Sequence, residues 1–108
     1  MKQPFVLTLP NNGNAYESIL KPPRAVNLRS GLVRLEPGRD VGLHSTEENE
    51  EMLVILEGTG ALECEGCGRF GVSGGQIAYM PPDTRHNVVN TGTDPLRYIY
   101  IVSRAPDD

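Results

Sequence analysis

The sequence lacks several features that assign a protein to a familiar class. It has no tryptophan, two histidines and two cysteines in 108 residues. Ten lysines and arginines face fourteen acidic residues, for a net charge of −4. No block or stripe of basic residues exists that would follow a phosphate backbone. We therefore expect no nucleic-acid partner.

Long apolar runs are absent as well. The segment MKQPFVLTLPNNGN holds only a short apolar patch interrupted by prolines, which does not match a signal peptide. No run approaches the roughly 20 apolar residues that a membrane-spanning helix needs. We therefore expect a cytoplasmic protein without a membrane partner.

Glycine and proline, in contrast, are abundant, with twelve and nine residues. They separate short apolar runs, and no window of eleven or more residues combines a helical period with caps. The length suits one domain, residues 1–108, with an N-terminal arm over about residues 1–24. The sequence predicts an all-β fold, either a sandwich or a closed barrel.

The predicted strands follow the apolar runs. They comprise residues 5–9, 17–20, 25–30, 31–36, 51–57, 74–80, 85–90 and 96–102, and a hairpin with the arms TGALECEG and CGRFGV. The runs MLVIL and YIYIV are apolar at both parities, which indicates strands covered on both faces. A second layer or a partner subunit would provide that cover, so we expect a homodimer.

Strand parity distinguishes the glutamates of GLHSTEENEEMLVILEGTG, residues 42–60. Glu51 shares one strand face with Leu53 and Ile55. A carboxylate at the end of an apolar wall must be paired, hydrogen-bonded or bound to a metal, or it holds its proton. The other glutamates of the stretch are expected in solvent: Glu47, Glu48 and Glu50.

The second histidine lies in MPPDTRHNVVN, where two prolines impose a turn before a new strand. His86 shares one face of that strand with Val88 and Asn90. A histidine on a strand is commonly a surface or hydrogen-bonded core residue, and a rigid turn also suits a metal ligand. Asn90 precedes the turn TGTDP and is expected to bond to the backbone.

The first of these segments resembles the first motif of the cupin family. GRDVGLHSTEENEEMLVILEG places Gly38, His44, Glu51 and Gly58 at the spacing of that motif. Thr46 is a departure, because most metal-binding cupins have a second histidine at this position. The first motif therefore covers residues 38–58.

The segment GQIAYMPPDTRHNVVN, residues 75–90, resembles the second cupin motif. It contributes these residues at the expected spacing: Gly75, Pro81, His86 and Asn90. Asp83 occupies a position that is glycine in the family, and aspartate is also a turn residue. The resemblance covers about half of the chain.

The resemblance implies a cupin-type β-barrel, or jelly roll, of two packed sheets. It implies that His44, Glu51 and His86 converge on a divalent metal ion such as iron, manganese, zinc or nickel. Two histidines and one carboxylate leave open metal positions, as in facial-triad iron sites and catalytic zinc sites. A small-molecule ligand would occupy those positions, and the implied activities are those of a metal-dependent oxygenase, isomerase or decarboxylase.

Thr46 keeps a second function open. With only three ligands available, the barrel is either an open metal centre or a non-catalytic sensor that lost tight metal binding. The candidate pocket residues are Arg34, Met80, Tyr98 and Tyr100, each of which is also a candidate core or rim residue.

The cysteines of CEGC fit a hairpin with its turn at Glu65 and Gly66. Cys64 and Cys67 would then face each other with Cα atoms roughly 4.5–5.5 Å apart, a separation that a disulfide accepts. In a reducing cytoplasm we expect free thiols, with a redox-responsive module as a third functional alternative.

Overall fold

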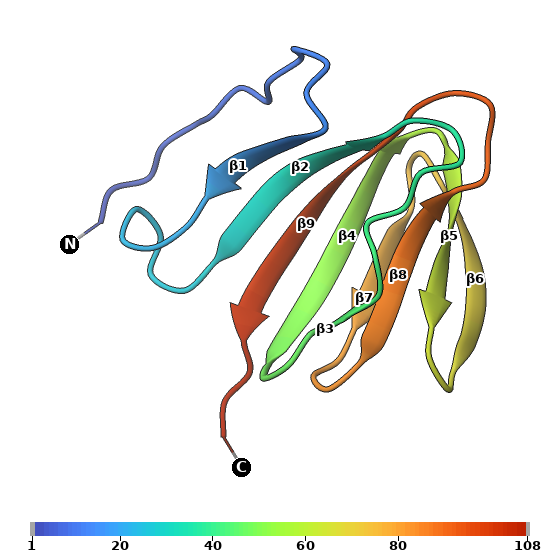
Figure 1. Cartoon of the computed structure of the whole chain (residues 1–108). Helices are drawn as coiled ribbons and strands as arrows, with labels where there is room; N and C mark the ends of the chain where they lie inside the picture. Colours follow the sequence, from blue (N-terminus) through green and yellow to red (C-terminus); the bar gives the residue numbers. More distant parts are fainter. Residues whose placement is uncertain (1, 108) are drawn as a thin grey trace.

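The computed structural model describes residues 2–107, which form nine strands in two antiparallel sheets (Figure 1). The first sheet has the order β1 (Tyr16–Leu20), β2 (Arg29–Leu35), β9 (Leu96–Arg104), β4 (Asn49–Glu57) and β7 (Ile77–Met80). The second has the order β3 (His44–Ser45), β8 (Arg85–Asn90), β5 (Thr59–Cys64) and β6 (Gly68–Ser73). Among residues 2–107 no helix is long and apolar enough to cross a membrane. The predicted all-β jelly roll is confirmed.

The core lies between the inner faces of the two sheets. Leu53 and Ile55 of β4 are each 1 % exposed, and they belong to one cluster with Val88 of β8 and Leu96 of β9, which are no more exposed than 2 %. Burial of one such side chain contributes about 2 kcal/mol relative to its exposure. The neighbouring β4 residues at even positions are only partly buried, so the predicted parity of β4 is confirmed.

Most predicted strands form where the apolar runs occur. The prediction for residues 85–90 matches β8 at both ends, and the predicted hairpin is formed by β5 and β6. Residues 5–9 are a correction, because they form no strand and Val6 is 95 % exposed. An apolar run becomes a strand only when it pairs with a sheet edge, and among residues 2–107 the outermost strand on the β2 side of the first sheet is β1, with residues 5–9 left unpaired.

Gly58 ends β4 at the passage into β5. Its φ of +89° lies in the left-handed region. A Cβ atom at this position would lie 2.4 Å from the carbonyl oxygen of Pro95. Only glycine meets both conditions without strain, which accounts for its place at the end of the first motif.

Candidate metal centre

Pairing between β3 and β8 places the two histidines side by side. His44 lies directly opposite His86 in the antiparallel register. Directly opposed residues point to the same face of a sheet. The two ring centroids are 4.3 Å apart with the rings tilted by 55°. The two motifs therefore supply one imidazole pair.

Glu51 reaches the same point from β4 in the opposite sheet. Its Oε1 lies 3.4 Å from Nε2 of His86. One ligand atom from each of His44, Glu51 and His86 lies within 4.8 Å of the others. The structure thus brings together all three residues that the sequence predicts as metal ligands.

The outer nitrogen of each ring is held by a backbone carbonyl. Nδ1 of His44 lies 2.8 Å from the Gly42 oxygen, and Nδ1 of His86 lies 3.1 Å from the Thr84 oxygen. A carbonyl only accepts a hydrogen bond, so Nδ1 carries the proton in both rings. The lone pair of each Nε2 is then available to a metal, an arrangement typical of histidine ligands.

The three residues differ in exposure. His86 is 1 % exposed and Glu51 is 9 % exposed, whereas His44 lies at the surface. Burial opposes the charge on His86, but the hydrogen bond to Glu51, the Thr84 carbonyl and the charge of Glu51 outweigh it and raise the pKa of His86 above 6.5. Without a metal, the surroundings of His86 therefore favour its protonated form.

Thr46 acts as a brace in the position where many cupins have a histidine. The side chain is 4 % exposed. Its hydroxyl donates to the Pro81 carbonyl at 2.7 Å and accepts from the Thr84 amide at 3.0 Å. Both bonds go to the turn before β8, so Thr46 holds the turn that positions His86.

Asp83 occupies its glycine position with a left-handed backbone. Its φ is +55°, and aspartate tolerates this region better than most residues. The Asp83 amide donates to the Glu47 carbonyl at 2.8 Å, and Glu47 has a φ of +56°. Two unusual backbone positions thus join the turns that precede β4 and β8. Glu47 itself is exposed, as predicted.

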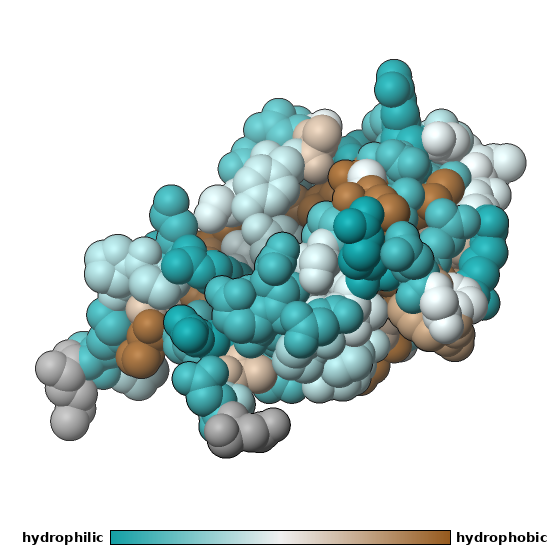
Figure 2. Space-filling view, turned by 60° about the horizontal axis from the view of Figure 1, so that its bottom comes forward, coloured by the Kyte–Doolittle hydropathy of each residue, from teal (hydrophilic) through white to brown (hydrophobic). Residues whose placement is uncertain are grey.

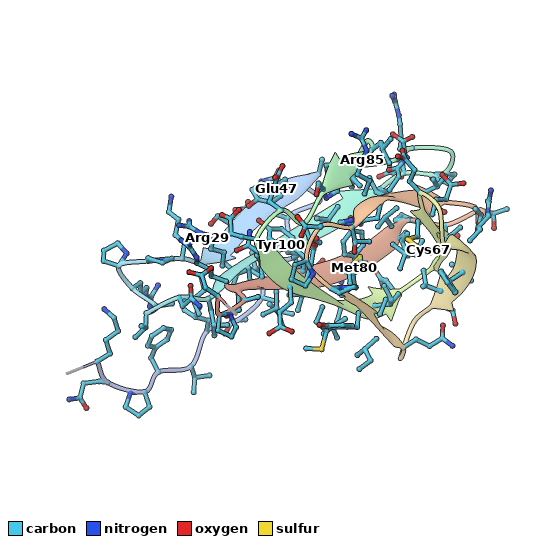
Figure 3. The ribbon with its side chains drawn as sticks, turned by 90° about the horizontal axis from the view of Figure 1, so that it is seen from below. Arg29, Glu47, Cys67, Met80, Arg85 and Tyr100 are labelled. Carbon is cyan, nitrogen blue, oxygen red and sulfur yellow. A yellow bond between two sulfur atoms is a disulfide. The ribbon has the colours of Figure 1, made fainter. Side chains whose placement is uncertain are left out.

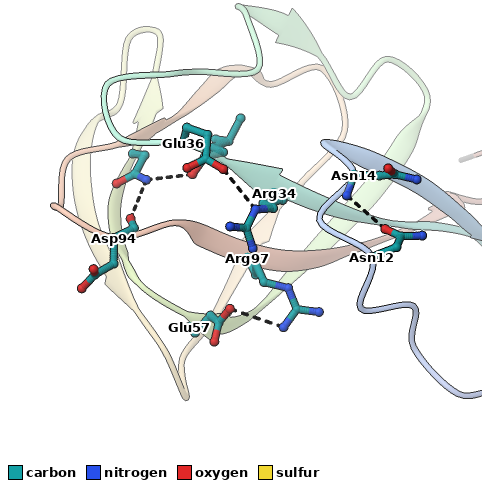
Figure 4. Close-up of polar contacts among 9 residues, drawn as sticks. Asn12, Asn14, Arg34, Glu36, Glu57, Asp94 and Arg97 are labelled. Atoms are coloured by element: carbon teal, nitrogen blue, oxygen red, sulfur yellow. Dashed lines mark hydrogen bonds and ion pairs between the residues drawn. The ribbon is translucent and has the colours of Figure 1, made fainter.

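Asn90 ends β8 and is 2 % exposed. Its amide nitrogen donates to the carbonyls of Leu35 and Asp94, each at 2.8 Å, and its oxygen accepts from Gly92 at 2.8 Å. The contact at Asp94 is drawn in Figure 4. The prediction of a structural amide is confirmed.

A cavity of about 350 Å³ opens beside the three candidate ligands. Of the four predicted pocket residues, Tyr98 and Tyr100 line it. Met80 is 1 % exposed and belongs to the core, and Arg34 pairs with Glu36 at 3.1 Å (Figure 4). Viewed from this end of the barrel, Tyr100 lies towards the middle and Glu47 on the rim (Figure 3). Figure 2 turns the lower end of the molecule in Figure 1 partly towards the viewer, and patches of apolar surface (brown) lie there between hydrophilic residues.

Tyr16 is a cavity residue that the sequence did not indicate. Its hydroxyl lies 2.6 Å from that of Tyr100, and the two rings stack with centroids 6.2 Å apart. The residue belongs to the edge strand β1, opposite Val33. No local pattern identifies Tyr16, because its orientation depends on the register between β1 and β2.

The cysteines form a disulfide, so the expectation of free thiols is wrong. Cys64 is paired with Gly68, and Cys67 belongs to the turn rather than to the opposite strand. The turn is one residue longer than predicted. Their Cα atoms are 5.2 Å apart, so the hairpin brings the sulfur atoms within reach of each other whatever the compartment.

Three comparisons relate the chain to known proteins. It is 29 % identical to an uncharacterized protein of Methanocaldococcus jannaschii over 90 residues, which cover 82 % of this chain and 71 % of that protein. A Cupin 2 conserved barrel domain protein of Salinispora arenicola has a TM-score of 0.79 at 19 % identity, covering 95 % of this chain and 92 % of that one. A predicted oxalate decarboxylase of Thermotoga maritima has a TM-score of 0.67 at 26 % identity, covering 71 % of this chain and 66 % of that one.

The family model for the cupin domain matches residues 31–102. This range contains both motifs and all three candidate ligands. The structural similarity to the Salinispora protein extends over almost the whole chain. The chain therefore belongs to the cupin family.

Proposed function

We propose that the protein binds a divalent metal ion through His44, Glu51 and His86, and a small molecule in the adjoining cavity. The observation that carries this proposal is the convergence of two imidazoles and one carboxylate within 4.8 Å. The hydrogen bonds at Nδ1 support it further, because they leave both Nε2 lone pairs free. Two nitrogens and one oxygen suit iron, manganese, zinc or nickel.

Each ligand has a separate task in this proposal. His86 gives a fixed point, because its ring is buried and its turn is braced. Glu51 brings one negative charge from the opposite sheet and offsets part of the charge of the ion. His44 closes the site at the rim. When bound, the metal supplies Lewis acidity that polarises an oxygen of the small molecule.

The apolar walls of the cavity would exclude water from the bound molecule. Leu53 and Val88 lie beside the ligands and are 1 % and 2 % exposed. A dry wall strengthens the electrostatic interactions of a polarised group. The arrangement suits an oxygenase, isomerase or decarboxylase, and the name of the Thermotoga relative supports the last of these as a type of reaction, not its substrate, by analogy alone.

A matched pair of glutamates tests metal binding. Glu50 and Glu51 are neighbours on β4, but Glu50 is exposed and bonded to Tyr79 at 2.9 Å. Protein purified without chelator should carry about one metal ion per chain, as should Glu50→Gln. We expect Glu51→Gln and His86→Ala to carry much less. Equal sub-stoichiometric metal in all four proteins would overturn the proposal.

A non-catalytic sensor is the second candidate function. The observation in its favour is Thr46, whose hydroxyl is committed to the turn before β8 and supplies no fourth ligand. Thermal-shift measurements against a panel of metabolites, with and without EDTA, separate the two candidates. Stabilisation that EDTA leaves unchanged would favour the sensor over the metal-dependent protein.

We also propose that the protein is a homodimer that covers the outer face of the first sheet. Ile77 and Tyr79 of β7 are 66 % and 59 % exposed, and they adjoin the partly buried apolar residues of β4. Sedimentation should show a dimer that Ile77→Lys weakens and Val26→Lys, elsewhere on the surface, does not. A monomeric wild type would refute this assembly.

A further inference from the structure

The cavity beside the candidate ligands is mainly apolar, and among residues 2–107 neither lysine nor arginine lines it. Its walls comprise these aliphatic side chains: Val33, Val41, Leu53, Val88 and Val102. Glu51 is the one carboxylate that the described part of the chain contributes to the lining. The charge of Arg29 makes the smallest contribution to the pKa of Tyr100, which it lowers, but Arg29 is not part of the lining. An anion in this cavity thus finds no positively charged residue.

The charges of the site set a limit on the occupant. A divalent ion and the carboxylate of Glu51 together leave a single positive charge, because both histidine ligands are neutral. One ionised oxygen on a bound molecule would balance that charge. A second negative charge would lie against the aliphatic walls without a partner, which is strongly unfavourable.

Tyr98 offers a hydrogen-bond donor inside the cavity. The residue is 3 % exposed and lines the cavity from β9. Burial, followed by the charges of Glu51 and Tyr100, raises the pKa of Tyr98 well above its ordinary value, so the hydroxyl keeps its proton. Among residues 2–107, no hydrogen bond engages this hydroxyl, whereas the Tyr100 hydroxyl is paired with Tyr16. The Tyr98 donor is therefore available to an oxygen of a bound molecule.

We propose that the cavity selects molecules with an apolar body, at most one negative charge, and an oxygen that accepts from Tyr98. Sugar phosphates and dicarboxylates are disfavoured. The inference rests on the proposed function, because the metal supplies the positive charge that anchors the ionised oxygen. It deepens that function by naming the class of substrate that fits this chain.

Titration calorimetry with metal-loaded protein tests the selection. The probes are benzoate and terephthalate, which share a ring and differ by one distant carboxylate, together with glucose 6-phosphate. We expect benzoate to bind at least tenfold more tightly than either dianion. Tyr98→Phe should weaken benzoate binding by about fivefold, the loss of one hydrogen bond, with the protein still folded and loaded with metal.

A gain-of-function variant gives an independent measurement. Val41 lines the cavity near its opening and is 37 % exposed, so a longer side chain has room there. Val41→Lys should improve terephthalate binding by about tenfold and change benzoate binding little, because it adds the missing cation. Metal content is measured on each sample beforehand.

The outcomes separate the two proposals. Metal-free wild-type protein would contradict the proposed function. Metal-loaded protein that binds either dianion as tightly as benzoate, or that does not bind benzoate, would overturn the selection while leaving metal binding intact.

Discussion

The two segments that supply the histidines differ in how firmly the fold holds them. His86 lies on the six-residue strand β8, between β3 and β5, and is 1 % exposed. His44 lies on the two-residue strand β3 at the edge of the same sheet, and its side chain is exposed. One ligand is thus part of the core and the other part of the rim.

The two histidines would therefore have different roles in a metal centre. A buried ligand with a braced turn keeps its geometry before the ion arrives. A rim ligand on a short edge strand moves at lower cost, because few contacts must be broken. The segment before β3 is held to β8 by the Val41 amide at 3.1 Å from the Val88 carbonyl, and by the Gly42 amide at 2.9 Å from Asn87.

The largest expected effect concerns the two histidines themselves. In metal-free protein, His86→Ala should lower the free energy of unfolding by about 3 kcal/mol, since it opens a cavity and leaves Glu51 unpaired. His44→Ala should change it by less than about 0.5 kcal/mol, as a surface substitution does. Urea denaturation in EDTA measures both. Equal losses would remove the distinction between core and rim.

Asn90 provides the next test on the firmly held segment. Asn90→Ala removes the hydrogen bonds to the carbonyls of Leu35 and Asp94 and from the Gly92 amide, and should cost about 2 kcal/mol. Asn87→Ala is the matched control, because Asn87 is only half-buried and bonds to Gly42 and Asp40. We expect a smaller loss there, measured by the same denaturation. A larger loss of stability in Asn87→Ala would show that the segment with His44 is held more firmly than the segment with His86.

Thr46 connects the two segments and should have a smaller effect. Thr46→Val removes both hydroxyl bonds to the turn before β8 and should cost about 1 kcal/mol, whereas Thr46→Ser keeps them. Metal content should fall in Thr46→Val and stay unchanged in Thr46→Ser, because only the valine variant loses the two bonds that hold the turn before His86. Equal metal content in both variants would show that the turn positions His86 without these bonds.

The smallest effect is a dependence on pH. Because the folded pKa of His86 is raised above 6.5, its contribution to stability is complete below that pH. The contribution is lost as the pH rises through the folded value. In EDTA, the urea concentration at the midpoint of denaturation should therefore decrease slightly as the pH rises above 6.5. His86→Ala should not show this decrease. Saturating zinc should reverse the trend, because metal binding requires neutral histidine.

Local patterns predicted the firmly held segment more completely than the loosely held one. The alternation of RHNVVN gave both ends of β8 and the inward side of His86. Parity also identified Glu51 among its neighbouring glutamates. The sequence did not predict β3, because a strand of two residues is too short to show an alternation of polar and apolar side chains. Its strand character comes from pairing with β8.

Other features needed the register between distant segments. Tyr16 lines the cavity because β1 pairs with β2. Arg34 lies outside it because successive side chains of β2 point to opposite faces of the sheet. The role of Thr46 also depended on the fold. As a residue type it offered a poor ligand, and only its distance to Pro81 and Thr84 identified it as a brace.

The amino-acid sequence by itself determined the all-β class, the inward face of β4 and the three candidate ligands, because a period of two and fixed motif spacings are local properties. The tertiary structure decided which ligand is buried, which tyrosines line the cavity and that no cation does. These properties arise from pairing between strands far apart in the chain, and from the packing of one sheet on the other.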